Sequence, residues 1–358
     1  MEQTTLYFKQ GGSDKVYQAS IEPNNGQFVV NFAYGRRGTT MQTGTKTPAA
    51  VNLDAARAIY EKLVNEKKAK GYSPGENSTP YQHTSHERNN TGILPQLLNP
   101  IEEDEVQRFI DDSAFVSQEK YDGKRILIQK EGAAINGINR RGLMCGIPSI
   151  LVNEVKQIPG DCVIDGESIG DVYWTFDVLM LHGNDVRAQP YKDRLFMLAQ
   201  IVSSDFGFIK LADTAYTTAE KVALLDRMKK EQREGVVFKQ LDAPYTAGRP
   251  NSGGSQFKYK LYATGSFIVW KVNAKRSVSL ALWGTSKGQP TTTPIQVTAG
   301  NVTIPANHAV PKVGAVVEVR YLHAFKESGV IYQPVYLGQR TDIDPSNCSI
   351  KQLKYKAA

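Results

Sequence analysis

The stretch SQEKYDGKRILIQK, residues 117–130, crowds charged side chains around one lysine, Lys120, and then continues as an apolar strand. A lysine amine acts as a nucleophile only when it is neutral, and neighbouring cations and a dry pocket favour the neutral form. Lys124 and Arg125 supply such positive charge close to Lys120 in the sequence. The stretch therefore predicts a reactive lysine in a cleft where a strand begins. A charged strand start with a turn glycine would produce the same four letters, KYDG.

Segments further along the chain repeat this combination of apolar strands with charged ends. They are INRRG (138–142), VIDGES (163–168), YWTFDVLML (173–181), EGVVFK (234–239) and FKYKLY (257–262). Buried strands normally avoid such charges. Carboxylates bind Mg²⁺ and lysines bind phosphate oxygens, so converging acids and lysines predict a metal–triphosphate site.

The length of 358 residues is enough for two or three domains, and 41% hydrophobic with 22% charged residues is typical of a soluble globular protein. No apolar run reaches 18 residues, and the first residues contain no apolar signal segment, so we expect a cytoplasmic protein without a membrane span. The three cysteines, Cys145, Cys162 and Cys348, form no CxxC motif. They predict reduced thiols rather than a disulfide framework or a zinc site.

The net charge of +7 is unevenly distributed: residues 1–75 carry +4, residues 76–262 carry −4, and residues 263–358 carry +7. Basic ends around an acidic middle suit a polyanionic partner such as nucleic acid. The alternative is that this charge only keeps the protein soluble.

Residues 1–75 predict a small domain of strands followed by a helix. Asn24-Asn25-Gly26 separates two alternating runs, which indicates a hairpin. The helix starts near residue 54, with Asn52 or Asp54 as its cap. Residues 76–99 are rich in Ser, Thr, Pro and Asn and predict an exposed linker, in which His83 and His86 are solvated rather than metal ligands.

Residues 100–262 predict an α+β domain with a cleft lined by a sheet, and residues 263–358 predict a strand-rich OB-fold barrel. The expected helices of the α+β domain are 102–112, 191–204 and 218–232. The fold class is therefore multidomain α+β.

The motifs KYDG, VIDGES, TFDVLML, EGVVFK and KYKLY, in this order, resemble those of the covalent nucleotidyltransferases, and most closely the ATP-dependent DNA ligases. The resemblance covers about residues 95–262 and extends to the C-terminal OB domain. It implies that Lys120 attacks the α-phosphate of ATP and carries AMP. Phe176 would lie under the adenine, and Glu167 and Glu234 would bind the metal. It assigns nucleotide contacts to Gln118, Glu119, Arg125, Arg140, Glu167, Phe176, Lys239, Lys258 and Lys260.

The segment NFAYGRRGTTMQTGTKTP, residues 31–48, with the helix after it, resembles a WGR domain in which Tyr34 replaces the tryptophan. The resemblance implies a domain that binds DNA near breaks. Tyr34 would stack on a base or sugar, and Arg36, Arg37 and Lys46 would pair with phosphates. The alternative is that Tyr34 belongs to the core and the arginines are solvated turn residues.

The last motif of the family, Arg-x-Asp-Lys, has its counterpart in GQRTDIDP, where Arg340 is expected to contact nucleic acid and Ile343 replaces the lysine. The resemblance implies that this lysine orients pyrophosphate. Lys351 or Lys354 could take its place.

The resemblance as a whole implies a monomeric ligase that seals 5′-phosphate/3′-hydroxyl nicks in duplex DNA through a lysyl-AMP intermediate. Such enzymes serve DNA replication, repair and recombination. The cofactors would be ATP and Mg²⁺, with Mn²⁺ as a substitute. The alternatives are a ligase for RNA or mixed RNA/DNA strands, an mRNA capping guanylyltransferase, and a non-catalytic nucleic-acid-binding relative.

Overall fold

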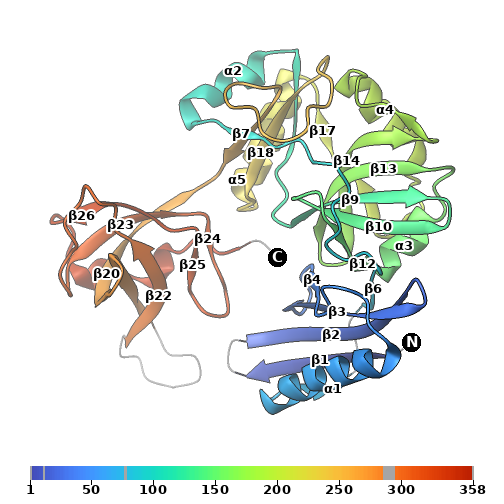
Figure 1. The fold of residues 1–358 in the computed structure, drawn as a ribbon. Coiled ribbons are helices and arrows are strands. Elements are labelled where there is room, and N and C mark those ends of the chain that lie inside the picture. The colour runs from blue at the N-terminus through green and yellow to red at the C-terminus, as the bar shows by residue number, and fades with distance from the viewer. Residues whose placement is uncertain (1, 11–12, 76–78, 285–294, 357–358) are drawn as a thin grey trace. The chain divides into compact units, whose positions relative to one another are not determined.

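The computed structural model describes residues 2–10, 13–75, 79–284 and 295–356 (Figure 1). These residues divide into two compact units. The first contains residues 1–224 and 237–258, and the second contains residues 225–236 and 259–358. Helices and sheets alternate in the first unit, which confirms the mixed α+β organisation. The predicted domain limits at residues 75, 99 and 262 stay predictions.

The N-terminal part of the first unit is a five-stranded sheet in the order β4-β3-β2-β1-β5. Its strands are β1 (Gln3–Gln10), β2 (Ser13–Asn24), β3 (Gln27–Arg36), β4 (Gln42–Thr45) and β5 (Ser73–Pro74). Asn25 and Gly26 join β2 to β3 with φ values of 48° and 79°, the left-handed conformation that a two-residue hairpin requires. The predicted hairpin is thus confirmed.

Helix α1 (Leu53–Ala69) lies along one face of this sheet (Figure 1). Asn52 is the cap, because its side chain accepts a hydrogen bond from the amide of Ala55. The buried face of the helix packs on Leu6, Tyr17 and Val30 of the sheet. The amphipathic spacing of its apolar residues therefore sets which face the helix covers.

The opposite face of the same sheet packs on the segment that we predicted to be an exposed linker. Tyr81 joins a cluster with Tyr7, Val16, Ala33 and Met41. In the same segment Thr84, Glu87 and Gln96 are also buried, so the prediction of an exposed linker is wrong for these residues.

Hydrogen bonds explain why so polar a segment is buried. Asn31 Nδ2 donates to the carbonyl of Thr84, Asn24 Nδ2 donates to the carbonyl of Ser85, and Thr43 Oγ1 donates to Glu87. A segment rich in polar side chains can be buried when its polar groups find such partners. Short strand β6 (Tyr81–Gln82) also pairs with β12 (Ile147–Pro148).

His83, expected to be solvated, is buried, and burial lowers its pKa to about 4. Protein atoms rather than water surround the His83 ring. Neither ring nitrogen has a hydrogen-bond partner among the described residues.

Two larger sheets make up most of the rest of the first unit, and residues 235–236 and 259–260 of the second of these sheets belong to the second unit. The larger has the order β11-β10-β9-β13-β14-β15, and β16 pairs with β14 in parallel. Its strands are β9 (Lys124–Glu131), β10 (Ala134–Asn139), β11 (Met144–Cys145), β13 (Cys162–Ile169), β14 (Val172–Leu181), β15 (Asn184–Asp185) and β16 (Ile209–Leu211). Helices α3 (Ser149–Val155) and α4 (Tyr191–Ile201) pack on one face and share its core (Figure 1).

The smaller sheet has the order β17-β8-β18-β19-β7. Its strands are β7 (Asn99–Pro100), β8 (Phe115–Glu119), β17 (Thr214–Ala215), β18 (Gly235–Gln240) and β19 (Gln256–Lys260). Helices α2 (Val106–Asp111), which follows a 3-10 turn at Glu103–Glu105, and α5 (Thr218–Lys230) fall where the sequence predicted helices, as does α4. The short helix α3 was not predicted.

The second unit is built on a five-stranded antiparallel sheet, in the order β22-β21-β20-β23-β26. Its strands are β20 (Ala263–Asn273), β21 (Ser277–Gly284), β22 (Ile295–Thr303), β23 (Val316–Tyr321) and β26 (Val335–Arg340), beside the small pair β24 (His323–Ala324) and β25 (Ile331–Tyr332). Two 3-10 turns follow, at Pro345–Asn347 and Ile350–Gln352. Edge strands β22 and β26 contact each other, but within the described part of the chain they form no ladder that closes a barrel. The strand-rich character is confirmed, and the OB-fold is not.

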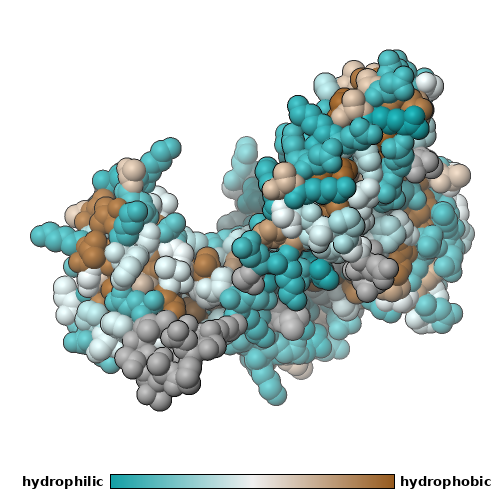
Figure 2. Space-filling view, turned by 90° about the horizontal axis from the view of Figure 1, so that it is seen from below, coloured by the Kyte–Doolittle hydropathy of each residue, from teal (hydrophilic) through white to brown (hydrophobic). Residues whose placement is uncertain are grey.

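Hydrophobic residues on the face seen in Figure 2 occur in small groups among hydrophilic ones. Across the residues that the structure describes, no helix has the length and apolar character needed to cross a membrane.

Candidate active site

Lys120 lies in the link between the two sheets of the first unit. Strand β8 ends at Glu119 in the smaller sheet, and β9 begins at Lys124 in the larger one. The motif KYDG is thus a connection from sheet to sheet rather than the beginning of a strand. Gly123 is needed there, because a Cβ at this position would collide with the carbonyl oxygen of Ser168.

A small pocket forms around Lys120. It is lined by Leu98, Gln118, Glu119, Lys120, Tyr121, Arg125, Glu167, Phe176, Val237 and Lys239. Seven of these were predicted as catalytic or nucleotide-binding residues, and they come from both sheets. Leu98, Tyr121 and Val237 were not predicted. The structure therefore places the predicted nucleophile among most of the residues expected to bind the nucleotide.

Arg125 is held in the pocket by a buried acid that was not among the predicted site residues. Its Nε and Nη2 atoms lie 2.6 and 2.7 Å from the two carboxylate oxygens of Asp165. Asp165 also accepts a hydrogen bond of 3.0 Å from the hydroxyl of Tyr245. Arg125 on β9 is also directly opposite Glu167 on the neighbouring strand β13. A two-point ion pair of this kind fixes the plane of the guanidinium.

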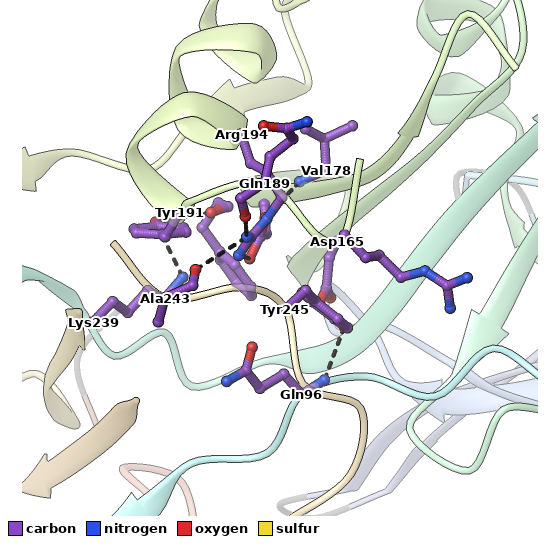
Figure 3. Close-up of polar contacts among 12 residues, drawn as sticks. Gln96, Asp165, Val178, Gln189, Tyr191, Arg194, Lys239, Ala243 and Tyr245 are labelled. Atoms are coloured by element: carbon purple, nitrogen blue, oxygen red, sulfur yellow. Dashed lines mark hydrogen bonds and ion pairs between the residues drawn. The ribbon is translucent and has the colours of Figure 1, made fainter. Parts of the chain in front are cut away.

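Lys239 is buried beside Phe176. Its Nζ lies 4.1 Å from the centre of the Phe176 ring. The same atom lies 3.3 Å from the hydroxyl of Tyr191 (Figure 3). Burial lowers the pKa of Lys239 to about 7. The guanidinium of Arg125 lies 4.5 Å from the same Phe176 ring. Two cations thus lie against the ring that was expected under the adenine.

A second buried ion pair lies behind the pocket. Arg194 is fully buried, and its Nε and Nη2 atoms lie 2.8 and 3.1 Å from the carboxylate of Asp177. Figure 3 shows Arg194 also reaching the carbonyls of Gln189 and Ala243. Arg194 was not predicted from the sequence, although a signal existed: it lies on the apolar stripe of α4, between Tyr191 and Leu198.

Aromatic stacking holds the residue after Lys120. The rings of Tyr121 and Trp174 are 4.9 Å apart and nearly parallel, at 13°. Tyr121 is buried with Phe176 and Ala212 in one cluster. This stacking restrains the KYDG link at the position next to the lysine amine.

Four predicted residues do not line this pocket. Arg140 is exposed in the turn after β10, at the sheet end where Asn139 is opposite Ile126. Lys258 lies on β19 beside β7. In the second unit, Lys260 Nζ lies 2.9 Å from the largely buried carboxylate of Glu234 and 3.1 Å from the side chain of Gln333. No described group of three or more His, Cys, Asp or Glu side chains is arranged to hold a metal ion.

The four residues predicted to bind nucleic acid in the N-terminal part form two groups. Tyr34 is 48% exposed and stacks on Tyr17 at 6.3 Å, and Lys46 lies over the neighbouring Phe32 ring at 5.4 Å. The alternative of a core Tyr34 is therefore wrong.

Arg36 and Arg37 line a groove of about 500 Å³ together with Tyr81 and Asp171. The side chain of Arg37 forms an exposed ion pair of 3.1 Å with Asp14. Both arginines thus border this groove, and Arg37 is exposed.

The C-terminal candidates lie in the second unit. Arg340 pairs with Glu318 at 3.1 Å and with Asp342 at 2.5 Å. Ile343 packs against the apolar core. The amine of Lys354 donates to the carbonyls of Arg233 and Leu261, whereas Lys351 is exposed. Of the two proposed substitutes for the motif lysine, Lys351 is the more accessible.

Two family models match this chain. Residues 167–260 match the "ATP dependent DNA ligase domain", and residues 2–79 match the "WGR domain". The ligase match contains Glu167, Phe176 and Lys258 and begins after Lys120.

Two curated proteins are similar to parts of the chain. A "Probable DNA ligase" from Anaeromyxobacter dehalogenans (strain 2CP-C) is 27% identical over 183 residues, 42% of this chain and 35% of that protein. A second "Probable DNA ligase", from Anaeromyxobacter sp. (strain Fw109-5), is 26% identical over 212 residues, 49% of this chain and 40% of that protein. The chain thus matches no more than 40% of the length of either relative.

Two solved structures align with large parts of the chain. One, "Pmar-Lig_Pre.", aligns with 81% of this chain and 72% of its own chain, with a TM-score of 0.51 and 16% identity. Another, "mycobacterial DNA ligase D complexed with ATP and MES", aligns with 72% of this chain and 98% of its own, with a TM-score of 0.42 and 20% identity. The family models agree with the resemblance noted in the sequence: residues 2–79 are similar to a WGR domain, and residues 167–260 are similar to part of an ATP-dependent DNA ligase domain.

Proposed function

We propose that this protein is an ATP-dependent DNA ligase whose nucleophile is Lys120. The observation that supports this proposal is the pocket around Lys120, in which Arg125, Glu167, Phe176 and Lys239 converge from two sheets. The family match does not include Lys120, so its place beside Glu167 and Phe176 is an independent argument.

The reaction has three phosphoryl transfers. The amine of Lys120 attacks the α-phosphorus of ATP, an N–P bond forms, the bond to the β-phosphate oxygen breaks, and pyrophosphate and a proton leave. An oxygen of the 5′-phosphate of a nick then attacks the AMP phosphorus, a P–O bond forms, the N–P bond breaks, and the lysine nitrogen takes up a proton. Finally the 3′-hydroxyl oxygen attacks the activated phosphorus, loses its proton and expels AMP. Each step depends on positioning and on neutralising phosphate charge.

The residues of the pocket supply this positioning. Asp165 fixes the Arg125 guanidinium through its Nε and Nη2 atoms. The guanidinium also lies over the Phe176 ring. Burial lowers the pKa of Lys239 to about 7, so about half of this lysine is neutral at pH 7, and an incoming phosphate would stabilise its charged form. Adenine would approach Phe176, and the phosphates would approach the cations beside it.

Magnesium fits this pocket through few protein ligands. The ion usually binds one or two carboxylates and completes its shell with phosphate oxygens and waters. Glu167 lines the pocket beside Lys120 and would hold the ion. Glu234, which we propose as the second acid, belongs to the second unit, where it pairs with Lys260. Bound there, Mg²⁺ would neutralise phosphate charge, and Mn²⁺ could replace it.

The other parts of the chain would bind the nicked duplex. We assign DNA contacts to Tyr34, Arg36, Arg37 and Lys46 in the WGR domain and to Arg340 in the second unit. We further propose that the sheet of the second unit is an OB-fold, and that the protein acts as a monomer.

Covalent labelling tests the proposal directly. The protein is incubated with ATP and magnesium and its intact mass is measured. We expect the addition of one AMP, absent from Lys120→Ala and present in Lys130→Ala, which changes a lysine at the far end of β9. The labelled protein is then given duplexes with one nick, with DNA or RNA on either side. Labelling of Lys120→Ala, or wild-type protein that never gains AMP, would overturn the proposed function.

A further inference from the structure

The WGR domain contacts the rest of the first unit at two points next to the pocket around Lys120. Thr40 Oγ1 donates to the carbonyl of Ser168 at 2.8 Å and lies 3.1 Å from the Ser168 hydroxyl. Lys124 Nζ donates to the carbonyl of Met41 at 2.9 Å. One loop of the WGR domain, residues 37–41, thus reaches both β9 and β13.

These two contacts adjoin the residues that line the pocket. Ser168 follows Glu167 on β13, and Lys124 precedes Arg125 on β9. In the sheet, Ser168 is directly opposite Lys124, and Glu167 is directly opposite Arg125. The WGR loop therefore contacts Ser168 and Lys124. These two residues lie next to Glu167 and Arg125, which line the pocket.

The contact is buried and closely fitted. Met41 is 4% exposed, and its amide donates to the hydroxyl of Tyr81 at 2.8 Å. Burial lowers the pKa of Lys124. A Cβ on Gly170, which has a φ of 59°, would lie 2.8 Å from the carbonyl oxygen of Gly38. Such close packing is typical of a protein interior and not of two independent domains in transient contact.

The charge of Lys124 is balanced within the same interface. Glu87 is the acidic group that faces it, beside the buried thiol of Cys145. Glu87 is in turn held by the hydroxyl of Thr43 on β4 and by the amide of Gly146. The lysine that touches the WGR domain is thus part of a network that this domain completes.

We infer that the WGR domain is a structural part of the ATP site: Thr40 and the carbonyl of Met41 are positioning groups that hold Ser168 and Lys124, and through them Glu167 and Arg125. This inference rests on the proposed use of the pocket for ATP. It predicts that changes in the WGR loop weaken nucleotide binding in the absence of any DNA.

The test measures ATP affinity in the full chain without DNA. Lys120→Ala is the background, so that ATP is bound and not consumed, and titration calorimetry with ATP and magnesium gives the Kd. Thr40→Val and Lys124→Met should each raise the Kd about three- to tenfold, the effect of losing one hydrogen bond. Thr40→Ser should keep the Kd of the background, because serine retains the hydroxyl.

Matched controls separate positioning from general damage. Thr39→Val changes the neighbouring threonine, whose hydroxyl donates to the carbonyl of Arg36 at the end of β3. Lys130→Met changes a lysine of the same strand that donates to the carbonyls of Lys156 and Ile158. Both should leave the Kd within twofold of the background. Partial unfolding would lower the number of binding sites without changing the Kd, so the two effects are distinguishable.

A Kd within twofold of the background for both Thr40→Val and Lys124→Met would overturn the inference, as would failure of Thr40→Ser to keep the Kd of the background. The proposed function is judged separately, by AMP addition to the wild-type protein. ATP binding that depends on Thr40 would support the inference even if no AMP were added, and absence of ATP binding would overturn both.

Discussion

The Nζ atom of Lys239 lies 4.1 Å from the centre of the Phe176 ring, inside the pocket that Lys120 lines. The two residues come from different sheets, Lys239 from β18 and Phe176 from β14. Their contact joins the two sheets at the site where we propose that adenine binds.

Replacing Lys239 by methionine should stabilise the fold and impair the reaction. Burial lowers the pKa of Lys239 from 10.5 to about 7. The unfolded chain therefore binds more protons between pH 7 and 10.5, so the lysine is most destabilising at pH 7 and below.

We expect Lys239→Met to raise the free energy of unfolding by about 1–4 kcal/mol at pH 7 and by much less at pH 10. Urea denaturation at both pH values measures this, and AMP addition should slow. A variant that is less stable than wild type at pH 7 would contradict the prediction.

His83 should make the fold sensitive to acid. Its folded pKa is about 4 and its ordinary value is 6.5, so below pH 6.5 the unfolded chain binds the proton more readily. Stability from this group is complete above pH 6.5 and is lost as the pH falls to about 4. From pH 7 to pH 5 the loss is about 2 kcal/mol.

Comparing urea denaturation of wild type and His83→Leu at pH 7 and pH 5 isolates this loss. The leucine variant should lose about 2 kcal/mol less than wild type over that interval. His86→Gln is the control and should behave as wild type. Equal pH dependence in His83→Leu and wild type would count against a buried neutral histidine.

The buried pair of Arg125 and Asp165 should be essential for stability. Asp165→Asn leaves the guanidinium without its carboxylate, which costs about 3–5 kcal/mol when the pair is buried. Asp185→Asn, which breaks the exposed pair with Arg187, should cost less than about 1 kcal/mol. Thermal and urea denaturation measure both. Similar losses in the two variants would show that burial of the first pair has no energetic consequence.

Tyr34 should contribute to DNA binding through its ring. Removing an aromatic ring that stacks on a base weakens binding by about 1–3 kcal/mol. Tyr34→Ala should therefore bind a nicked duplex about five- to 150-fold more weakly, whereas Tyr34→Phe keeps the ring and should bind nearly as wild type. Fluorescence anisotropy at fixed salt gives the affinities. Wild-type affinity in Tyr34→Ala would show that the Tyr34 ring does not contribute to DNA binding.

Arg36 and Arg37 should contribute through charge. Each arginine that neutralises one phosphate adds about 0.9 to the slope of log affinity against log salt. The double variant Arg36→Ala/Arg37→Ala should reduce this slope by about 2, with similar weakening for every DNA sequence. An unchanged slope would indicate that the arginines bind no phosphate.

Several features of this protein follow from its sequence alone because they are local. Asn25-Gly26 forms the hairpin since these residues accept left-handed backbone angles, and α1 begins at Asn52 since its side chain caps the helix. The order of the motifs from KYDG to KYKLY indicates the family in the same way, because each motif is a short contiguous pattern.

Only the tertiary structure decided which of these residues meet. The pairing of Arg125 with Asp165, the burial of Arg194 against Asp177, and the contact of Thr40 with Ser168 join positions far apart in the chain. Residues near His83 were expected in solvent, because composition does not reveal which distant backbone groups will accept their hydrogen bonds. The periodicity of a segment tells which side is apolar, whereas the element that covers that side depends on how whole sheets pack.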